Sequence, residues 1–362
     1  MAIKPRLAND WLNEQPLGAV FAALGDAECR LVGGCVRDGL IGLPVADIDL
    51  ATTLVPNEIM SKAEAAGLKA IPTGLSHGTV TVIASSVHFE VTTLREDVAT
   101  DGRHAVVAFA SDWRTDAARR DFTINALYAD ARGDVTDYFG GLDDLEAKRV
   151  RFIGAPAQRI TEDALRILRF YRFSGRFAGT LDEEGRAACA AKVGMIKSLS
   201  RERIAAEWLK ILAHDTPAET IAAMVQDGVV AAFLPEATLS GLQDCLAREE
   251  ESGLSPSVAR RFAAMLPRDE TVVNNIARRL KLSNVLRKAL VGRVLAAQAT
   301  SQSPHALYYR FGFEEGQDGL LLSGLELPAD AAPWTRPTFP IKAADIQAAA
   351  GLEGKALGAA LH

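Results

Sequence analysis

Two closely spaced carboxylates that follow a Gly-Gly turn are the residues of this chain best suited to chemistry. They and their neighbours are Gly33, Gly34, Arg37, Asp47 and Asp49. If the two aspartates lie in a strand, they project from one face, because side chains two positions apart point the same way. Paired carboxylates hold hard cations, glycines let the backbone approach a phosphate, and an arginine can fork onto its oxygens. The pattern therefore predicts Mg²⁺-assisted phosphoryl or nucleotidyl transfer, with a glycine turn and two surface aspartates as the alternative.

A second group of charged residues occurs in the sequence Arg-Arg-Asp-Phe-Thr-Ile-Asn after a polar stretch. Its first members, Arg119 and Arg120, can neutralise a triphosphate and the pyrophosphate that departs from it. Asp121 and Asn125 are expected to orient the arginines or to bond ribose hydroxyls. A structural Arg–Asp pair beneath a sheet is the alternative.

A third group lies in residues 162–173, EDALRILRFYRF, which has the pattern of an amphipathic helix. On one helix, Asp163 and Arg166 would be neighbours and would offer an acceptor beside a planar donor. Cytosine and adenine satisfy such a pair, whereas guanine and uracil leave it mismatched. Arg169 follows about 60° further round the helix, and Arg172 lies about half a turn from Asp163, where it would reach a sugar or phosphate or anchor the helix. The alternative is a helix with surface arginines.

The order and combination of these motifs resemble those of the class II tRNA nucleotidyltransferases, or CCA-adding enzymes, and of the related bacterial poly(A) polymerases. The matching segments are Gly33–Asp38 with Asp47 and Asp49, Arg119–Ala126, Gly140–Leu145 and Glu162–Phe173. The resemblance implies an enzyme that adds CCA to the 3′ end of tRNA without a template, using CTP and ATP and releasing pyrophosphate.

The resemblance also assigns roles to residues. It implies that Asp47 and Asp49 are catalytic and hold Mg²⁺. Glu90, on a predicted neighbouring strand, is expected as a third catalytic acid, with a solvated strand-edge glutamate as the alternative. Nucleotide binding is expected from Gly33, Gly34, Arg37, Arg119, Arg120, Asp121, Asn125, Asp163, Arg166, Arg169 and Arg172.

The elements that must position these residues change in kind along the chain. β-Branched runs over 79–84 and 87–92 predict an antiparallel hairpin across Ser85-Ser86. A helix is predicted over 7–25, and the polar residues 95–118 predict a mobile loop near the site. From about Asp143 onward the pattern is helical.

Together with the resemblance, this pattern predicts an α+β fold. A mixed-sheet nucleotidyltransferase head of the DNA polymerase β type is expected over 1–148, and it carries catalysis. A helical neck that binds the nucleotide base and RNA is expected over 149–230, and a helical body and tail that bind tRNA over 231–362.

Composition limits the class of protein. The 362 residues are 48% hydrophobic and 24% charged, as in soluble globular proteins, and no apolar run is long enough to cross a membrane. Four cysteines without metal-ligand spacing favour a reducing cytoplasm. The net charge of −6 argues against nucleic-acid binding, but residues 148–176 carry eight basic and two acidic side chains, and residues 260–293 carry nine and two. These stretches predict RNA-binding surfaces, with a pair of solvated helix faces as the alternative.

Several alternatives remain open from the sequence. Poly(A) addition, or addition of only C or only A, would use the same motifs. A non-catalytic RNA-binding protein on the same scaffold would be expected to lose its metal-binding acids first. His214-Asp215 is interpreted as a helix end, because no further histidines gather around it to form a phosphohydrolase site. The predicted partners are the acceptor end of tRNA, CTP and ATP, with no membrane, and the sequence specifies no oligomeric state.

Overall fold

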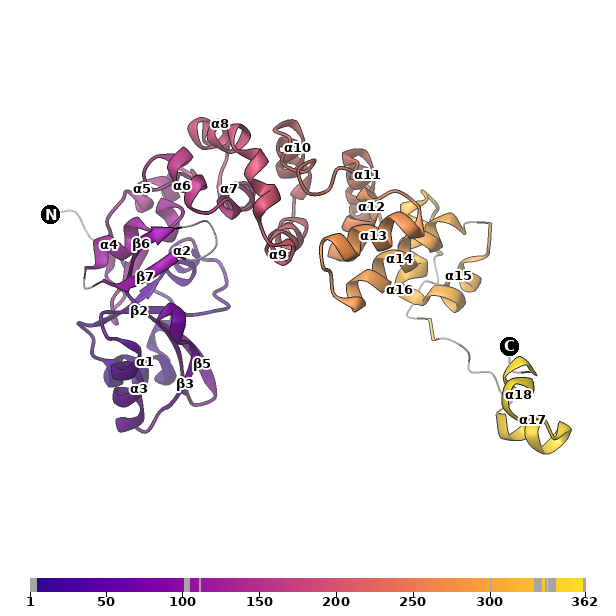
Figure 1. Ribbon diagram of the computed structural model, residues 1–362, viewed down its shortest axis with the longest axis horizontal. Coiled ribbons are helices and arrows are strands. Elements are labelled where there is room, and N and C mark those ends of the chain that lie inside the picture. Colours follow the sequence, from indigo (N-terminus) through magenta and orange to yellow (C-terminus); the bar gives the residue numbers. More distant parts are fainter. Residues whose placement is uncertain are drawn as a thin grey trace. The chain divides into compact units, whose positions relative to one another are not determined.

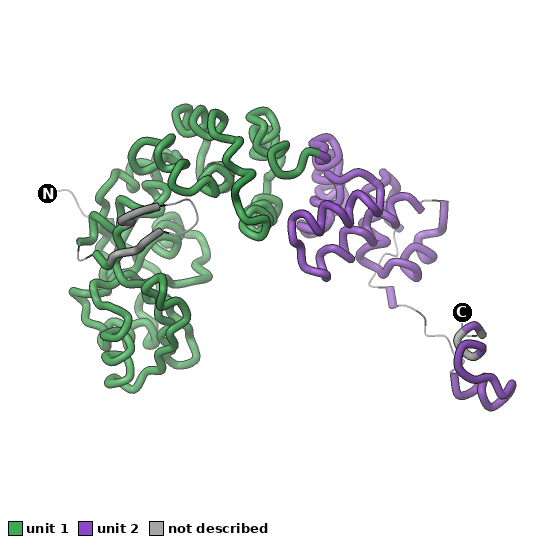
Figure 2. Tube along the Cα trace, viewed as in Figure 1, with its two compact units in different colours: residues 1–235 green, residues 236–362 purple. Residues whose placement is uncertain are grey.

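The computed structural model describes residues 5–100, 105–110, 112–299, 301–328, 334–335, 337 and 343–360. The chain divides into two compact units, 1–235 and 236–362 (Figure 2). The first unit contains the strands and the helices up to α10, and the second unit is helical (Figure 1). The finer division into head, neck and body at residues 148 and 230 stays a prediction.

The first unit contains a mixed sheet of seven strands in the order β3-β4-β5-β2-β1-β8-β9. The strands are β1 Cys29–Val32, β2 Asp49–Thr52, β3 Lys69–Gly74, β4 Thr79–Ala84, β5 Val87–Thr93, β8 Leu127–Ala129 and β9 Val135–Asp137. Strand β2 is parallel to β5, and the other neighbours in this sheet are antiparallel. A sheet of this kind, followed by helices, confirms the predicted α+β fold.

The hairpin predicted across Ser85-Ser86 is confirmed. Strands β4 and β5 pair in antiparallel register from Thr79 opposite Thr92 to Ala84 opposite Val87. Both serines have positive φ, 48° and 68°, as a two-residue turn of type I′ requires.

Helices cover the sheet and then continue the chain. Those of the first unit are α1 Gln15–Leu24, α2 Gly34–Leu40, α3 Pro56–Ala65, α4 Trp113–Ala118, α5 Gly141–Glu146, α6 Pro156–Glu162, α7 Leu165–Phe177, α8 Glu183–Ala191, α9 Arg201–Leu212 and α10 Pro217–Gln226. Short 3₁₀ turns lie at Asp10–Asn13, Leu75–His77, Thr123–Asn125 and Val193–Ser198. The predicted helical character from about Asp143 onward is confirmed for the described residues.

The two faces of the sheet bury different side chains. Leu50 packs in the large apolar core together with Phe21 of α1. Ala51, the next residue, belongs to a separate cluster with Tyr128, because successive side chains of a strand alternate between faces. Asp49 lies two residues before Ala51 and therefore shares its face. The sheet thus presents this acid on the face opposite the core that contains α1.

Two predicted elements differ from the structure. The helix predicted over 7–25 begins only at Gln15, because Pro16 favours a helix start and Arg6 pairs with Asp134 as an isolated bridge. The loop predicted over 95–118 is wrong. Strands β6 Arg95–Thr100 and β7 Ala105–Phe109 form a two-stranded ribbon, and α4 follows. Residues 101–104 and 111 of that loop lie outside the described chain.

The second unit contains helices α11 to α18. They are α11 Leu239–Glu251, α12 Val258–Met265, α13 Glu270–Arg279, α14 Asn284–Gln298, α15 Pro304–Phe311, α16 Phe313–Leu322, α17 Ala343–Ala350 and α18 Gly354–Ala360. The sequence also predicts a linker at 326–340, and most of that segment lies outside the described residues. No helix in the described part of the chain combines the length and the apolar character that a bilayer crossing requires.

The basic stretch 260–293 is less available to RNA than its sequence predicts. Arg260 and Arg293 are buried and donate to the two oxygens of Asp318 at 2.5 and 2.6 Å. Arg261 is also buried, and it donates to Glu249 at 2.9 Å. The expectation that the whole stretch forms an RNA-binding surface is therefore wrong for these three arginines, which hold helices of the second unit together.

Candidate active site

A cavity of about 390 Å³ in the first unit gathers side chains from all three sequence groups. Its lining consists of Gly33, Gly34, Arg37, Asp49, Arg120, Asp121, Asn125, Asp163, Arg166, Arg169, Arg172 and Phe173. Of the residues predicted for the site, Asp47, Glu90 and Arg119 lie outside this lining. The acid Asp49 and the pair of Asp163 and Arg166 therefore share one cavity.

Three acids lie close together where β2 begins beside β5. Asp49 opens β2 and is the register partner of Glu90 on the parallel strand β5, so their side chains leave the same face. Asp47 precedes β2, which begins two residues later than predicted. Burial raises the pKa of Asp49, Glu90 and Asp47 raise it further, and Arg120 opposes them. A cation among these carboxylates would relieve their mutual repulsion.

The donor set where β2 begins fits a metal ion that the substrate helps to hold. Among the described residues, no group of three or more His, Cys, Asp or Glu side chains is arranged to hold a metal by itself. Mg²⁺ is commonly bound by one or two carboxylates, and water and substrate phosphates complete its octahedral shell. Asp47 and Asp49 both reach solvent, and Asp49 does so in the wall of the cavity, where the surrounding protein still desolvates its carboxylate.

The Gly-Gly turn brings the backbone close to an arginine of the cavity. Gly33 has a φ of 73°, which favours glycine, and its N–H donates to the carbonyl oxygen of Leu127 at 3.0 Å. A Cβ at this position would lie 3.5 Å from Nη1 of Arg120. The glycine therefore leaves room between the turn and the Arg120 guanidinium.

A chain of hydrogen bonds joins α2 to α7 along the wall of the cavity. Arg37 donates to Oδ1 of Asn125, whose amide donates to Oδ1 of Asp121 at 3.0 Å. Oδ2 of Asp121 accepts from Arg169 Nε and Nη2 at 2.7 and 2.6 Å. Burial alone would raise the pKa of Asp121, but Arg169 and Asn125 outweigh burial and lower it. These four predicted residues are thus ordered by one another.

Arg119 and Arg120 are both anchored by Asp116, a buried carboxylate that the sequence analysis missed. Arg119 Nη2 lies 2.7 Å from Oδ1, Arg120 Nη2 lies 3.1 Å from Oδ2, and the Tyr128 hydroxyl donates at 2.7 Å. Burial would raise the pKa of Asp116, but the two arginines outweigh it and lower the pKa to about 2. From this anchor Arg120 lines the cavity, whereas Arg119 accepts from Arg166 through its backbone carbonyl at 3.1 Å.

The expectation that Asp163 and Arg166 lie on one continuous helix is wrong. Helix α6 ends at Glu162, Asp163 is extended with φ −151° and ψ 106°, and α7 begins at Leu165. Oδ1 of Asp163 accepts from the Leu165 amide at 3.1 Å, a local bond by which aspartate competes with helix continuation. The two side chains meet at the cavity across a helix break, rather than as neighbours on one helix.

Different neighbours hold the two members of this pair. Oδ2 of Asp163 accepts from Arg203 of α9 at 2.7 Å, and Arg166 Nη1 donates to Glu162 at 2.7 Å. Because Asp163 is outside α7, the predicted half-turn separation from Arg172 does not apply, and Arg172 lines the same cavity.

A second buried acid that the sequence analysis missed, Glu207 of α9, orients the arginines of α7. It accepts from Arg172 Nε at 2.5 Å and lies 3.8 Å from Arg169 Nη1. The ring of Phe173 lies 4.1 Å from the Arg172 guanidinium and 5.1 Å from that of Arg169. The signal that could have identified Glu207 is its place as a lone acid on the apolar side of α9, one position before Trp208.

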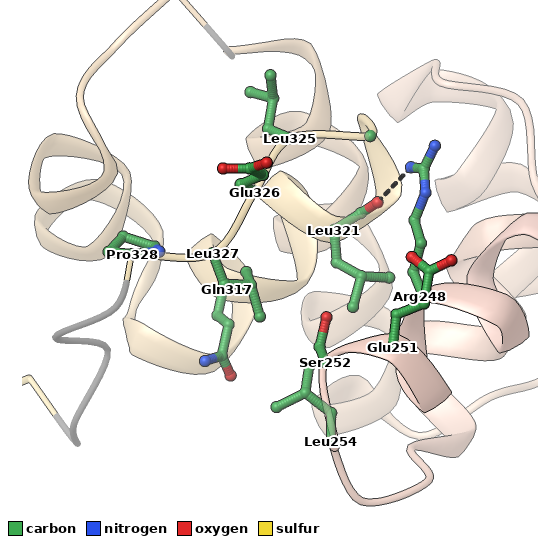
Figure 3. A pocket seen from close by; sticks show the side chains of 11 residues that line it. Arg248, Glu251, Ser252, Leu254, Gln317, Leu321, Leu325, Glu326, Leu327 and Pro328 are labelled. Atoms are coloured by element: carbon green, nitrogen blue, oxygen red, sulfur yellow. Dashed lines mark hydrogen bonds between the residues drawn. The ribbon is translucent and has the colours of Figure 1, made fainter.

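A larger cavity, about 580 Å³, lies in the second unit (Figure 3). Arg248 donates there to the carbonyl oxygen of Leu321 at 2.6 Å, and the lining includes the acids Glu251 and Glu326. None of the residues of the three sequence groups lines it. The smaller cavity of the first unit is therefore the better candidate for chemistry.

Comparisons with known proteins identify the family. Residues 29–151 match the poly A polymerase head domain, and residues 180–239 match a probable RNA and SrmB-binding site of polymerase A. A mouse protein named CCA tRNA nucleotidyltransferase 1, mitochondrial, is 35% identical over 360 residues, which span 92% of this chain and 81% of the relative. This chain belongs to the family of CCA tRNA nucleotidyltransferases and poly(A) polymerases.

Solved structures of CCA-adding enzymes share the fold. The Bacillus stearothermophilus enzyme in complex with CTP is 23% identical, with a TM-score of 0.70 over 96% of this chain and 92% of that chain. The Thermotoga maritima enzyme complexed with tRNA is 21% identical, with a TM-score of 0.68 over 91% and 84%. The likeness confirms the predicted nucleotidyltransferase head with its helical continuation.

Proposed function

We propose that this protein adds CCA to the 3′ end of tRNA by template-independent nucleotidyl transfer from CTP and ATP, with release of pyrophosphate. The observation that carries the proposal is the single cavity lined by Asp49 and by the pair of Asp163 and Arg166. One nucleotide can then have its triphosphate at the acids and its base at the pair. The family supports this reaction, as do the CTP and the tRNA named with the two solved enzymes.

The acids of the sheet would hold Mg²⁺ against the triphosphate. Asp47 and Asp49 are its proposed ligands, and Glu90 adds negative charge beside Asp49. Bound Mg²⁺ would lower the pKa of the RNA 3′-hydroxyl and would stabilise the charge of the leaving pyrophosphate. Arg120, anchored by Asp116, faces the same space and neutralises phosphate charge.

The remaining phosphate and ribose contacts follow from the wall of the cavity. Gly33 and Gly34 leave the backbone open to the triphosphate. Arg37, Asp121 and Asn125 line the cavity with their side chains already hydrogen-bonded to one another, so we assign them to shaping the phosphate and ribose subsite. Arg119 was expected to contact the triphosphate but lies outside the lining, so we assign it instead to holding Arg166 through its backbone carbonyl oxygen.

Base selection is assigned to Asp163 and Arg166. The carboxylate accepts from the amino group that cytosine and adenine both carry, and the guanidinium donates to the adjoining ring acceptor. Uracil and guanine present the opposite arrangement and leave a charged group unpaired in the cavity, which is costly. Arg169 and Arg172 follow on α7 and support base recognition by Asp163 and Arg166. Asp121 holds the first of them and Glu207 holds the second.

A product assay tests the proposal. A tRNA that ends before CCA is incubated with Mg²⁺ and with each nucleotide triphosphate, alone and together, and the product is sequenced. We expect three additions in the order C, C, A. A long run of A would indicate a poly(A) polymerase, and additions of only C or only A would indicate a partial enzyme. Binding of tRNA without incorporation would indicate a non-catalytic RNA-binding protein.

We assign the protein to the cytoplasm. Its four cysteines are free and buried, which suits a reducing compartment. The mouse relative is named as mitochondrial, so the compartment is to be tested by fractionation of the source cells. Recovery with an organelle or membrane fraction would contradict the assignment.

A further inference from the structure

A second cavity of about 530 Å³ adjoins the candidate active site. Its lining comes from α7 and from the corner that joins α9 to α10, and it consists of Arg172, Gly175, Arg176, Lys210, Ala213, His214, Asp215 and Thr216. Arg172 lines this cavity and the nucleotide cavity alike. The two spaces therefore meet at one side chain, and the second has no role in the reaction as described so far.

Basic side chains dominate the charge of this second cavity. Arg172, Arg176 and Lys210 line it, against one acid of the lining, Asp215. Arg172 is already paired with Glu207, so Arg176 and Lys210 are the cations most available to a ligand. Arg176 has 39% of its side chain exposed and lies 3.4 Å from Asp38, so that pairing is loose. Lys210 is exposed. The cavity therefore favours an anionic ligand, and arginine with lysine is the usual combination for phosphate.

The charges of this cavity affect the pKa of a histidine in its lining, His214. Burial, followed by the positive charges of Arg172 and Arg176, lowers the pKa of His214 to about 4, and Asp215 opposes the shift. The imidazole is therefore neutral near pH 7. An anion that entered the cavity would offset the two guanidinium charges and raise the pKa of His214. The pKa of His214, measured by NMR on isotope-labelled protein, therefore reports whether an anion occupies the cavity.

We propose that this cavity binds a backbone phosphate of the RNA strand whose 3′ end enters the adjoining active site. The proposal rests on the proposed function, because that function supplies the strand. Arg176 follows Arg172 by four residues, a rise of about 6 Å along α7. Arg176 therefore extends the positive charge of the nucleotide cavity about one helical turn further along α7, into the second cavity.

RNA is favoured over the other phosphate source near the site, free pyrophosphate. Residues 180–239, which include Lys210 and His214, match the model described as a probable RNA-binding site. Asp49, the acid at which the triphosphate is placed, lines the nucleotide cavity but does not line this second cavity. Pyrophosphate shares the phosphate chemistry, and the experiment below separates the two sources.

The first arm of the test compares two charge reversals. Lys210→Glu changes an exposed side chain of the cavity, and Lys69→Glu makes the same change on β3, an exposed position at the outermost strand of the sheet. We expect Lys210→Glu to weaken binding of a tRNA that lacks CCA about tenfold and to reduce the salt slope by about one. The KM for CTP should stay within twofold. Equal tRNA affinity and equal salt slopes in the two variants would overturn the proposal.

The second arm uses the unmodified protein and the resonances of His214. Its pKa is measured by NMR alone, with the tRNA, and with inorganic pyrophosphate. We expect tRNA to raise the pKa by at least one unit and pyrophosphate to leave it unchanged. A rise with pyrophosphate but not with tRNA would overturn the proposal and assign the cavity to the leaving group.

Failure of this inference and failure of the proposed function are distinguishable. Both arms measure binding without nucleotide transfer, whereas the sequenced product reports CCA addition. A wild-type protein that adds C, C and A while both arms are negative would refute only the phosphate site.

Discussion

Arginines of the two units have similar sequence contexts but different surroundings. In the first unit, Arg169 and Arg172 are paired with Asp121 and Glu207, yet they still line a cavity. In the second unit, Arg260 and Arg293 share Asp318 and have 7% and 5% of their side chains exposed. A dense basic stretch therefore indicates a binding site only where its arginines, although ion-paired, still line a cavity.

The largest effect on activity is expected from a substitution of Asp49, the cavity acid proposed to hold Mg²⁺. Asp49→Asn removes a proposed Mg²⁺ ligand, so nucleotide incorporation should fall by at least about 10³-fold, equivalent to about 4 kcal/mol of transition-state stabilisation. Because Asp49 is repelled by Glu90 and Asp47, the substitution should not lower the melting temperature. Single-turnover incorporation and tRNA affinity are measured together, and the affinity should stay within threefold.

The matched control is Asp26→Asn, an exposed aspartate of the same unit outside the cavity lining. It should leave incorporation unchanged. Turnover like that of the wild type in Asp49→Asn would remove the metal assignment.

The buried ion network of the second unit, formed by Arg260, Arg293 and Asp318, should affect stability rather than catalysis. Asp318→Ala leaves Arg260 and Arg293 buried without their shared carboxylate, which is expected to lower the free energy of unfolding by about 3–5 kcal/mol. Urea unfolding measures this loss. In protein that remains folded, the KM for CTP should be unchanged, because the nucleotide cavity belongs to the first unit.

Glu314→Ala serves as the control for the network. Its side chain is 82% exposed and 3.9 Å from Arg293, so it should cost less than about 1 kcal/mol. Equal losses in the two variants would contradict the account of the second unit as a buried ion network.

A smaller catalytic effect is expected at the base-reading pair. Asp163→Ala removes the acceptor of the base amino group, so kcat/KM for CTP should fall about 100-fold, or about 2.7 kcal/mol. Incorporation of UTP should fall much less, so discrimination between CTP and UTP narrows. An equal fall for both nucleotides would indicate that Asp163 only supports the helix break through Leu165 and Arg203.

The smallest effect is a pH dependence from Asp116. Its pKa is lowered to about 2, so the stabilisation it contributes is full above about pH 4 and is lost as the pH falls toward 2. The pH-dependent part amounts to about 2 kcal/mol. The difference in unfolding free energy between the wild type and Asp116→Asn should shrink by that amount from pH 7 to pH 2. A difference independent of pH would show that Asp116 is not ionised against Arg119 and Arg120.

Local patterns predicted the parts of the molecule that depend on local chemistry. The hairpin at Ser85-Ser86 follows from two β-branched runs and a two-residue gap. The break after Glu162 was not predictable from periodicity, because one hydrogen bond from the Leu165 amide to Asp163 overrides an otherwise helical pattern.

The remaining differences have two causes. The ribbon of β6 and β7 was missed because β6 is largely polar and the apolar run AVVAF of β7 lies inside a longer polar stretch. Asp116 was missed although Arg119 and Arg120 follow it by three and four residues, because only the structure shows that its carboxylate is buried. Glu207 was missed because Arg172, which it anchors, lies 35 residues earlier in the chain. The same reason explains why the basic stretch after Arg260 was taken for a surface.

The central claim is that one bound nucleotide spans the acids at the start of β2, Asp47 and Asp49, and the base-reading pair, Asp163 and Arg166. A crystal structure of the protein with CTP and Mg²⁺ tests it most directly. The account predicts a metal-bound triphosphate at Asp47 and Asp49 and the cytosine amino group within hydrogen-bond distance of Asp163, with Arg166 donating to the ring. A CTP whose phosphates lie at those acids while its base points away from Asp163 and Arg166 would contradict it.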